Sequence, residues 1–222
     1  MFQNDVVGVV LVYLYVAVLV VCTEKILSKK YPVASRKFLH IMTGNIAFIL
    51  PVFQTREMMA FVAAGPFILF TFLMSPYSPF KKIRGKTSEA GHGLGLVYYA
   101  ITWTVLAYVF FEYRVIIAMG ILAMSYGDGL ASIIGIRYGR RTYRIFRDTK
   151  SYVGSLAMFL VTFLVLIVAF LFYAVPVTTI LLGYLLWIAA LATLVEGITP
   201  FGLDNLSVPF ITAFFYWGFL VR

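Results

Sequence analysis

The chain has 222 residues, of which 62% are hydrophobic and only 12% are charged, and its mean hydropathy is +0.95. A soluble domain of this size cannot bury so much apolar surface, so the composition excludes a soluble enzyme and indicates an integral membrane protein. Basic loops on one side of a membrane explain the formal net charge of +9, and we therefore expect no nucleic-acid partner.

Eight apolar segments follow one another along the chain. About 20 apolar residues cross a bilayer as a helix, so the sequence predicts an all-α, polytopic bundle of seven to eight transmembrane helices. These form a single integral membrane domain over residues 1–222. The second and last segments are short, and we expect them to be tilted, broken or partly interfacial. The expected helices are 6–22, 38–53, 57–74, 94–112, 114–136, 153–174, 180–196 and 206–221.

The cations of the chain concentrate in alternate loops. We expect the N-terminus outside, because 15 of the 18 lysine and arginine residues then fall in the inner loops, within 25–37, 81–86 and 137–150. This asymmetry follows the positive-inside rule. It predicts a multi-pass protein with a polar site that faces the cytoplasm. The lack of a transit peptide suits a prokaryotic plasma membrane.

Asp128 is the only acid within the apolar segment 114–136. A charge inside the membrane costs free energy unless a partner or water compensates it, so Asp128 is a candidate functional residue. Glycines flank it, and each costs about 1 kcal/mol in a helix relative to alanine. Small residues recur at every fourth position of this helix, at Gly127, Ala131, Gly135 and Gly139. Helix packing explains the small residues but not the aspartate.

A basic stretch and a predicted helix start follow this segment. The motif Lys150-Ser151-x-x-Gly154-Ser155 opens the next apolar segment. Helix N-termini bind anions through free backbone N–H groups and the helix dipole. We therefore interpret the motif and the preceding Arg140 as a site for the phosphates of a nucleotide. The simpler alternative is that these residues only end helices and set the topology.

Glu196 and Asp204 are the other acids expected near the inner face. Together with Asp128 they could hold a Mg²⁺ ion that bridges phosphates, although capping or solvation explains each of them equally well. Lys37 is expected at the N-terminus of the second helix, and His40 lies one turn later on the same face. His40 could contact phosphate or act as a general base, with a structural role as the alternative.

Two spaced motifs, Asp128-x-x-Ala131-x-x-x-Gly135-x-x-x-Gly139 and Lys150-Ser151-x-x-Gly154-Ser155, resemble the signature of the polyprenol kinase family. This family includes phytol kinases and dolichol kinases. The flanking sequences from Ser35 to His40, at Glu196, and from Asp204 to Pro209 are also similar to its motifs, so the resemblance covers about residues 34–215. The basic insert from Arg140 to Thr149 departs from the family pattern by its length.

The resemblance implies a membrane enzyme that phosphorylates an isoprenoid alcohol, such as phytol, geranylgeraniol or a polyprenol, with CTP and a divalent metal. It implies that the stretch 128–155 is the nucleotide site. The residues expected to bind the nucleotide are Lys37, Gly127, Asp128, Ala131, Gly135, Gly139, Arg140, Lys150, Ser151, Gly154, Ser155 and Asn205. Asp128, Glu196 and Asp204 then hold Mg²⁺, and Glu196, Asp204 or His40 orients or deprotonates the alcohol. Two alternatives stay open: a membrane cytidylyltransferase that makes a CDP-lipid, and a small transporter.

Overall fold

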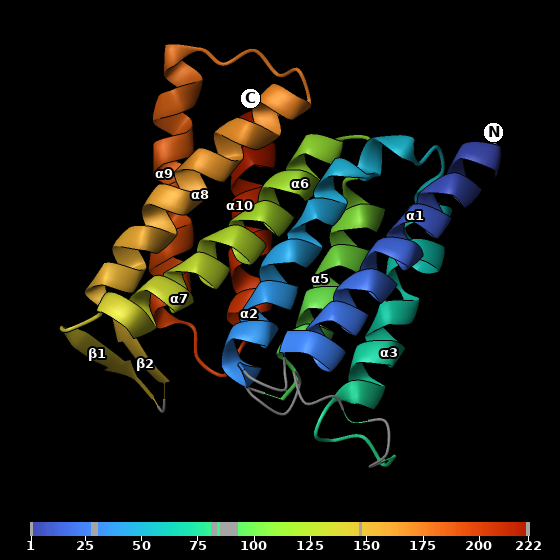
Figure 1. Ribbon diagram of the computed structural model, residues 1–222. Coiled ribbons are helices and arrows are strands. Elements are labelled where there is room, and N and C mark those ends of the chain that lie inside the picture. The colour runs from blue at the N-terminus through green and yellow to red at the C-terminus, as the bar shows by residue number, and fades with distance from the viewer. Residues whose placement is uncertain (1, 28–30, 81–83, 85–92, 147, 221–222) are drawn as a thin grey trace. The chain divides into compact units, whose positions relative to one another are not determined.

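The structure is a computed structural model that describes residues 2–27, 31–80, 84, 93–146 and 148–220 (Figure 1). It is 79% helical. Four of its helices are long and apolar enough to cross a membrane: Gln3–Lys25, Arg114–Tyr138, Tyr152–Phe172 and Thr179–Ile198. The described residues thus confirm a helical membrane protein, and the total of seven to eight spans stays a prediction. The chain divides into two compact units, Met1–Arg114 and Val115–Arg222.

The N-terminal unit consists of helical segments of different type. Helix α1 packs against α2 and the π-helix η4, and α5 packs against α3 and η4. The segments are α1 (Phe2–Val21), the π-helix η1 (Cys22–Leu27), α2 (Pro32–Thr43), the 3₁₀ helices η2 (Gly44–Phe48) and η3 (Leu50–Val52), η4 (Met58–Ala64), α3 (Pro66–Met74) and α5 (Gly95–Val109).

The second helix differs from the expected range 38–53. Helix α2 begins at Pro32, because proline lacks an N–H group and suits the first helical position. It ends at Thr43, where the chain tightens into 3₁₀ turns, so the expectation of a broken segment is confirmed. Lys37 therefore lies inside the helix, and its predicted place at the helix N-terminus is wrong.

A buried acid near the start of α1 has a structural explanation. The Asp5 carboxylate accepts hydrogen bonds from the backbone N–H of Gln54 at 2.7 Å, and from the N–H and Oγ1 of Thr55 at 3.1 and 3.2 Å. Arg114 donates a hydrogen bond at 2.7 Å to the carbonyl of Phe53, the residue before Gln54. These bonds satisfy the polar backbone between η3 and η4, as burial requires.

The C-terminal unit is a bundle of long helices with a β-hairpin at one end (Figure 1). Helix α8 packs against α7, the π-helix η6 and α9, and α10 packs against α9 and η6. The elements are α6 (Arg114–Leu122), η6 (Ala123–Asp128), α7 (Gly129–Tyr138), β1 (Thr142–Ile145), β2 (Asp148–Ser151), α8 (Tyr152–Phe172), α9 (Thr179–Ile198) and α10 (Asp204–Leu220).

Four predicted helices of this unit begin and end within two residues of the observed ones: 114–136, 153–174, 180–196 and 206–221. Capping side chains explain this agreement, because they stop the helix pattern at defined positions. The Ser151 hydroxyl accepts from the N–H of Gly154 at the start of α8, and the Thr178 hydroxyl accepts from Leu181 at the start of α9.

The hairpin was not expected from the sequence. Strands β1 and β2 pair antiparallel in the register Thr142↔Ser151 to Ile145↔Asp148, so a two-residue connection joins them. This connection begins with Phe146, at a φ of 53°. Such turns usually carry Asn-Gly or Asp-Gly, and a phenylalanine gives no turn signal. The described residues of the basic insert thus include a hairpin that leads directly into α8.

Candidate functional site

Asp128 is the last residue of a π-helical turn in the middle of the stretch Arg114–Tyr138. Single π-turns inside α-helices occur frequently at functional sites. The residue is only 8% exposed, and both α8 and α10 pack against η6. The predicted functional acid therefore lies inside the C-terminal unit, covered by other helices.

Three carboxylates meet at this place. Asp128, Glu196 in the last turn of α9, and Asp204 at the start of α10 each offer an oxygen, and the three oxygens lie within 4.8 Å of one another. Glu196 is 7% exposed, and the Asp204 side chain is 15% exposed. The structure thus brings together the acids that the sequence indicated as metal ligands, although they are up to 76 positions apart in the chain.

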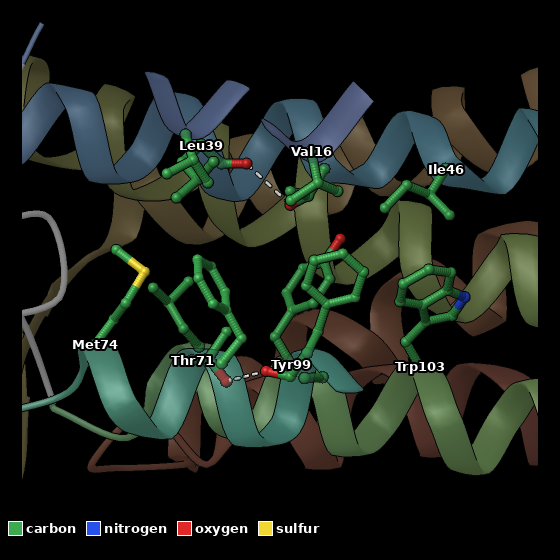
Figure 2. A pocket seen from close by; sticks show the side chains of 13 residues that line it. Val16, Leu39, Ile46, Thr71, Met74, Tyr99 and Trp103 are labelled. Carbon is green, nitrogen blue, oxygen red and sulfur yellow. Dashed lines mark hydrogen bonds between the residues drawn. The ribbon is translucent and has the colours of Figure 1, made fainter. Parts of the chain in front are cut away.

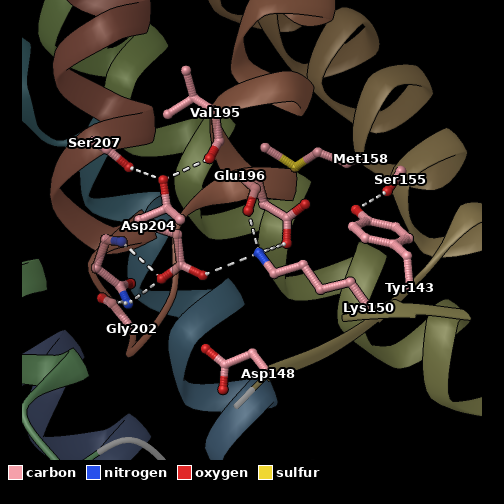
Figure 3. A network of polar contacts seen from close by, with 12 residues as sticks. Tyr143, Asp148, Lys150, Ser155, Met158, Val195, Glu196, Gly202, Asp204 and Ser207 are labelled. Carbon is pink, nitrogen blue, oxygen red and sulfur yellow. Dashed lines mark hydrogen bonds and ion pairs between the residues drawn. The ribbon is translucent and has the colours of Figure 1, made fainter. Parts of the chain in front are cut away.

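Lys150 reaches into this acidic cluster from β2 (Figure 3). Its Nζ lies 2.6 Å from Glu196 Oε1 and 3.9 Å from Asp204 Oδ2, and it also donates to the main-chain carbonyl of Glu196. Burial lowers the pKa of Lys150, but the charges of Glu196, Asp204 and Asp128 outweigh burial and raise the pKa above its ordinary value. The ammonium group therefore stays protonated at neutral pH.

The electrostatics of the cluster favour a divalent cation. Two ionised carboxylates 4.8 Å apart repel each other by about 3 to 4 kcal/mol at an effective dielectric constant of about 20. Lys150 supplies one positive charge against three carboxylates, which leaves a net charge of −2 when all of them are ionised. Carboxylate oxygens are the ligands that Mg²⁺ prefers, so the donor set fits that ion.

Asp148 ties the hairpin to the loop between α9 and α10. Its Oδ2 accepts from the N–H of Phe201 at 2.8 Å. Phe201 and Gly202 have φ values of 61° and 75°, a conformation that is strained for phenylalanine. This bond holds the strand that carries Lys150 against the loop that leads to Asp204. Sequence reasoning missed this residue, whose only signal was being the single acid in a basic stretch.

Asn205 stabilises the same loop from the other side. Its side-chain Nδ2 donates to the carbonyl of Gly202 at 3.0 Å, and its backbone N–H donates to Asp204 Oδ1 at 2.9 Å (Figure 3). These contacts orient the Asp204 carboxylate. The predicted contact of Asn205 with a nucleotide stays a prediction beside this structural role.

The small residues of α7 form a close contact with the start of α8. A Cβ atom added to Gly135 would lie 2.8 Å from Ser151 Oγ, and one added to Gly154 would lie 3.0 Å from the carbonyl of Ala131. Packing therefore accounts for the glycine spacing. The Gly154 N–H, predicted to bind phosphate, donates to Ser151 Oγ at 3.1 Å, so a phosphate would have to replace this hydrogen bond.

We expect Gly139→Ala to destabilise the C-terminal unit by about 1–3 kcal/mol, the usual cost of overpacking. The added methyl group would collide with the carbonyl of Gly135 and with Ser151, which caps α8. Thermal unfolding in detergent measures this change. Gly183→Ala in α9 is the matched control, because nothing lies within 4 Å of the added atom and alanine favours the helix. Equal melting temperatures for the two variants would contradict the packing role.

The other candidates on this unit have separate places. The hydroxyls of Ser155 and Tyr143 are hydrogen-bonded at 2.8 Å, which connects α8 to β1 (Figure 3). Arg140 is exposed between α7 and β1. The predicted phosphate contacts of Ser155 and Arg140 stay predictions.

His40 and Lys37 belong to the N-terminal unit. The His40 ring is 6% exposed and packs edge-on against Tyr99, with 5.3 Å between ring centroids. Lys37 is half-buried on the same helix. The predicted roles of His40 as a base and of Lys37 as a phosphate contact stay predictions.

Known proteins similar to this chain carry one activity in their names. A phytol kinase of Synechocystis sp. is 33% identical over 214 residues, which cover 96% of the chain and 90% of the relative. Probable chloroplastic phytol kinases of Triticum aestivum and Oryza sativa are each 33% identical, over 83% and 80% of the chain and 67% and 62% of the relatives. No family model matches the chain, and no solved structure matches it significantly. The chain therefore belongs to the phytol kinase family and is a kinase, a phosphotransferase that acts on an alcohol.

Proposed function

We propose that this kinase transfers the γ-phosphoryl group of CTP to phytol or a related isoprenoid alcohol, at the cytoplasmic face of the membrane and with Mg²⁺. The observation that carries the proposal is the buried cluster of Asp128, Glu196 and Asp204, with Lys150 among them. Phosphoryl transfer depends mainly on positioning and on neutralising charge. A site of three acids and one lysine supplies the groups for both.

The proposed transfer balances between the alcohol, CTP and a base that the protein supplies. The alcohol oxygen attacks the γ-phosphorus, and the bond from that phosphorus to the oxygen bridging to the β-phosphate breaks, so CDP leaves with the electron pair. The hydroxyl proton passes to a base. Asp204 is the better candidate within the cluster, because its oxygen is 3.9 Å from Lys150 whereas Glu196 is held at 2.6 Å. His40 is the alternative base.

Each charged residue has a proposed task. Asp128, Glu196 and Asp204 would hold Mg²⁺, which neutralises phosphate charge when bound. Lys150 donates hydrogen bonds to the phosphate oxygens once it leaves Glu196, as a compact cation on a flexible stem can. Asp148 keeps the hairpin and the α9–α10 loop together during this exchange, through its bond to Phe201.

The proposed cytoplasmic location rests on charge. The hairpin that delivers Lys150 also carries Arg141 and Arg144, and both are exposed. The hydrogen bond from Phe201 to Asp148 places this basic hairpin and the α9–α10 loop at the same end of the C-terminal unit. Basic segments stay in the cytoplasm during membrane insertion. A nucleotide would reach this end from water, while the alcohol stays in the bilayer.

The decisive experiment follows two labels of CTP. The protein is purified in detergent and incubated with phytol, Mg²⁺ and CTP labelled at either the γ- or the α-phosphorus. We expect the γ-label in phytyl phosphate and the α-label in CDP. Neither labelled product should form when EDTA is present. With phytyl phosphate in place of phytol, an α-label in the lipid product would identify a cytidylyltransferase instead. Transfer from ATP with none from CTP would overturn the proposed donor.

A further inference from the structure

The N-terminal unit contains an apolar cavity between α1, α2, α3 and α5 (Figure 2). It has about 630 Å³ of empty space, part of which is open to the surroundings. None of the residues that line the cavity belongs to the acidic cluster of the other unit.

The cavity is elongated along the helices. Three of its walls present residues seven positions apart: Leu39 and Ile46, Phe67 and Met74, and Leu96 and Trp103. Seven residues of α-helix rise about 10 Å. Figure 2 shows Leu39 and Met74 at one end of the cavity and Ile46 and Trp103 at the other. A long, narrow ligand fits this shape better than a flat one.

The walls are largely apolar, and among the described residues that line them the indole Nε1 of Trp103 is a buried donor with no hydrogen-bond partner. No charged side chain lines the cavity in the part of the chain that the structure describes. The hydroxyls of Thr43 and Thr71 donate to carbonyls of their own helices, those of Leu39 at 2.9 Å and Phe67 at 2.7 Å. These bonds satisfy the hydroxyl protons locally. The surface therefore suits a hydrocarbon chain and does not suit a nucleotide or a metal ion.

We propose that this cavity binds the isoprenoid chain of the alcohol substrate. The proposal rests on the proposed function and adds to it the place where the hydrocarbon part of the alcohol binds. The hydroxyl end of the isoprenoid chain lies at the end marked by Leu39, because His40 adjoins Leu39 on α2. The hydrocarbon extends from there toward Ile46 and Trp103. Methyl branches contact the Phe67 and Phe70 rings, and longer chains continue into lipid through the open part.

A filling substitution tests this assignment kinetically. Ala100 is 3% exposed and lines the cavity, so Ala100→Phe places a ring where the chain lies. We expect the KM for phytol to rise at least tenfold and the KM for the nucleotide to stay unchanged. Val105→Phe on the same helix is the matched control, because Val105 is 38% exposed and does not line the cavity. An unchanged KM for phytol in active Ala100→Phe protein would overturn the proposal.

Photolabelling tests the same assignment without turnover. A phytol analogue with a diazirine at the far end of its chain is bound to the detergent-purified protein, and the labelled peptides are mapped. We expect labelling near Ile46 and Trp103. An excess of phytol should abolish this labelling, an excess of phosphatidylcholine should not, and the Ala100→Phe variant should not be labelled there. Equal competition by phosphatidylcholine would show a general lipid site and overturn the proposal. Specific labelling in a protein that transfers no phosphate would refute the proposed function and leave the chain site standing.

Discussion

Asp128→Asn is expected to lower the rate of phytol phosphorylation at least 10³-fold while the protein remains folded. The substitution keeps the shape of the side chain and removes the charge that the proposed metal site needs. A loss of this size corresponds to about 4 kcal/mol of transition-state stabilisation, within the range that metal ions supply. Initial rates at saturating phytol and nucleotide, over a series of Mg²⁺ concentrations, measure the effect.

Stability separates this result from simple misfolding. Asp128 lies within 4.8 Å of two other carboxylates, so its neutralisation relieves repulsion and should leave the melting temperature equal or higher. Glu112→Gln is the control, because Glu112 is an exposed acid outside the cluster, and its variant should keep full activity. Wild-type rates in Asp128→Asn at every Mg²⁺ concentration would remove the metal proposal.

Much of the C-terminal fold could be predicted because its signals are local. Long apolar runs define the helices of this unit, and side chains such as Ser151 and Thr178 mark where two of them begin. The hairpin could not be predicted, because its turn contains a phenylalanine in place of the usual asparagine or glycine. The start of α2 at Pro32 could have been found from the preference of proline for the first turn.

The candidate site was predictable to the extent that membrane burial makes charged residues costly. An acid in an apolar segment is costly, which is why Asp128 could be identified. Glu196 was expected near it because both were placed at the inner face, where carboxylates can share a metal ion. The contact of Asp148 with Phe201 joins residues 53 positions apart, and no local pattern reports such a pairing. The glycines near Asp128 fit both a functional site and helix packing, since they allow α7 to pack closely on α8 beside the cluster.

Lys150→Met is expected to change turnover and metal binding in opposite directions. In the structure the ammonium group lies beside Glu196 and Asp204, so its positive charge competes with a divalent ion for these carboxylates. Its removal leaves three carboxylates without this cation, so Mn²⁺ should bind at least tenfold more tightly in the absence of nucleotide. Turnover should nevertheless fall about 10²-fold or more, because phosphate loses a donor and a positive charge. Electron paramagnetic resonance titration of Mn²⁺ and the phytol assay measure the two quantities.

The opposite signs make this prediction informative about mechanism. A lysine that only stabilised the fold would, when removed, weaken metal binding and activity together, because the three acids would no longer be held in place. Arg144→Met on β1 is the matched control: Arg144 is an exposed cation of the same hairpin, paired across from Thr149, and its loss should alter neither quantity much. Weaker Mn²⁺ binding in Lys150→Met would contradict the competition between the ammonium group and the metal. Full turnover in that variant would show that Lys150 does not contact the phosphates.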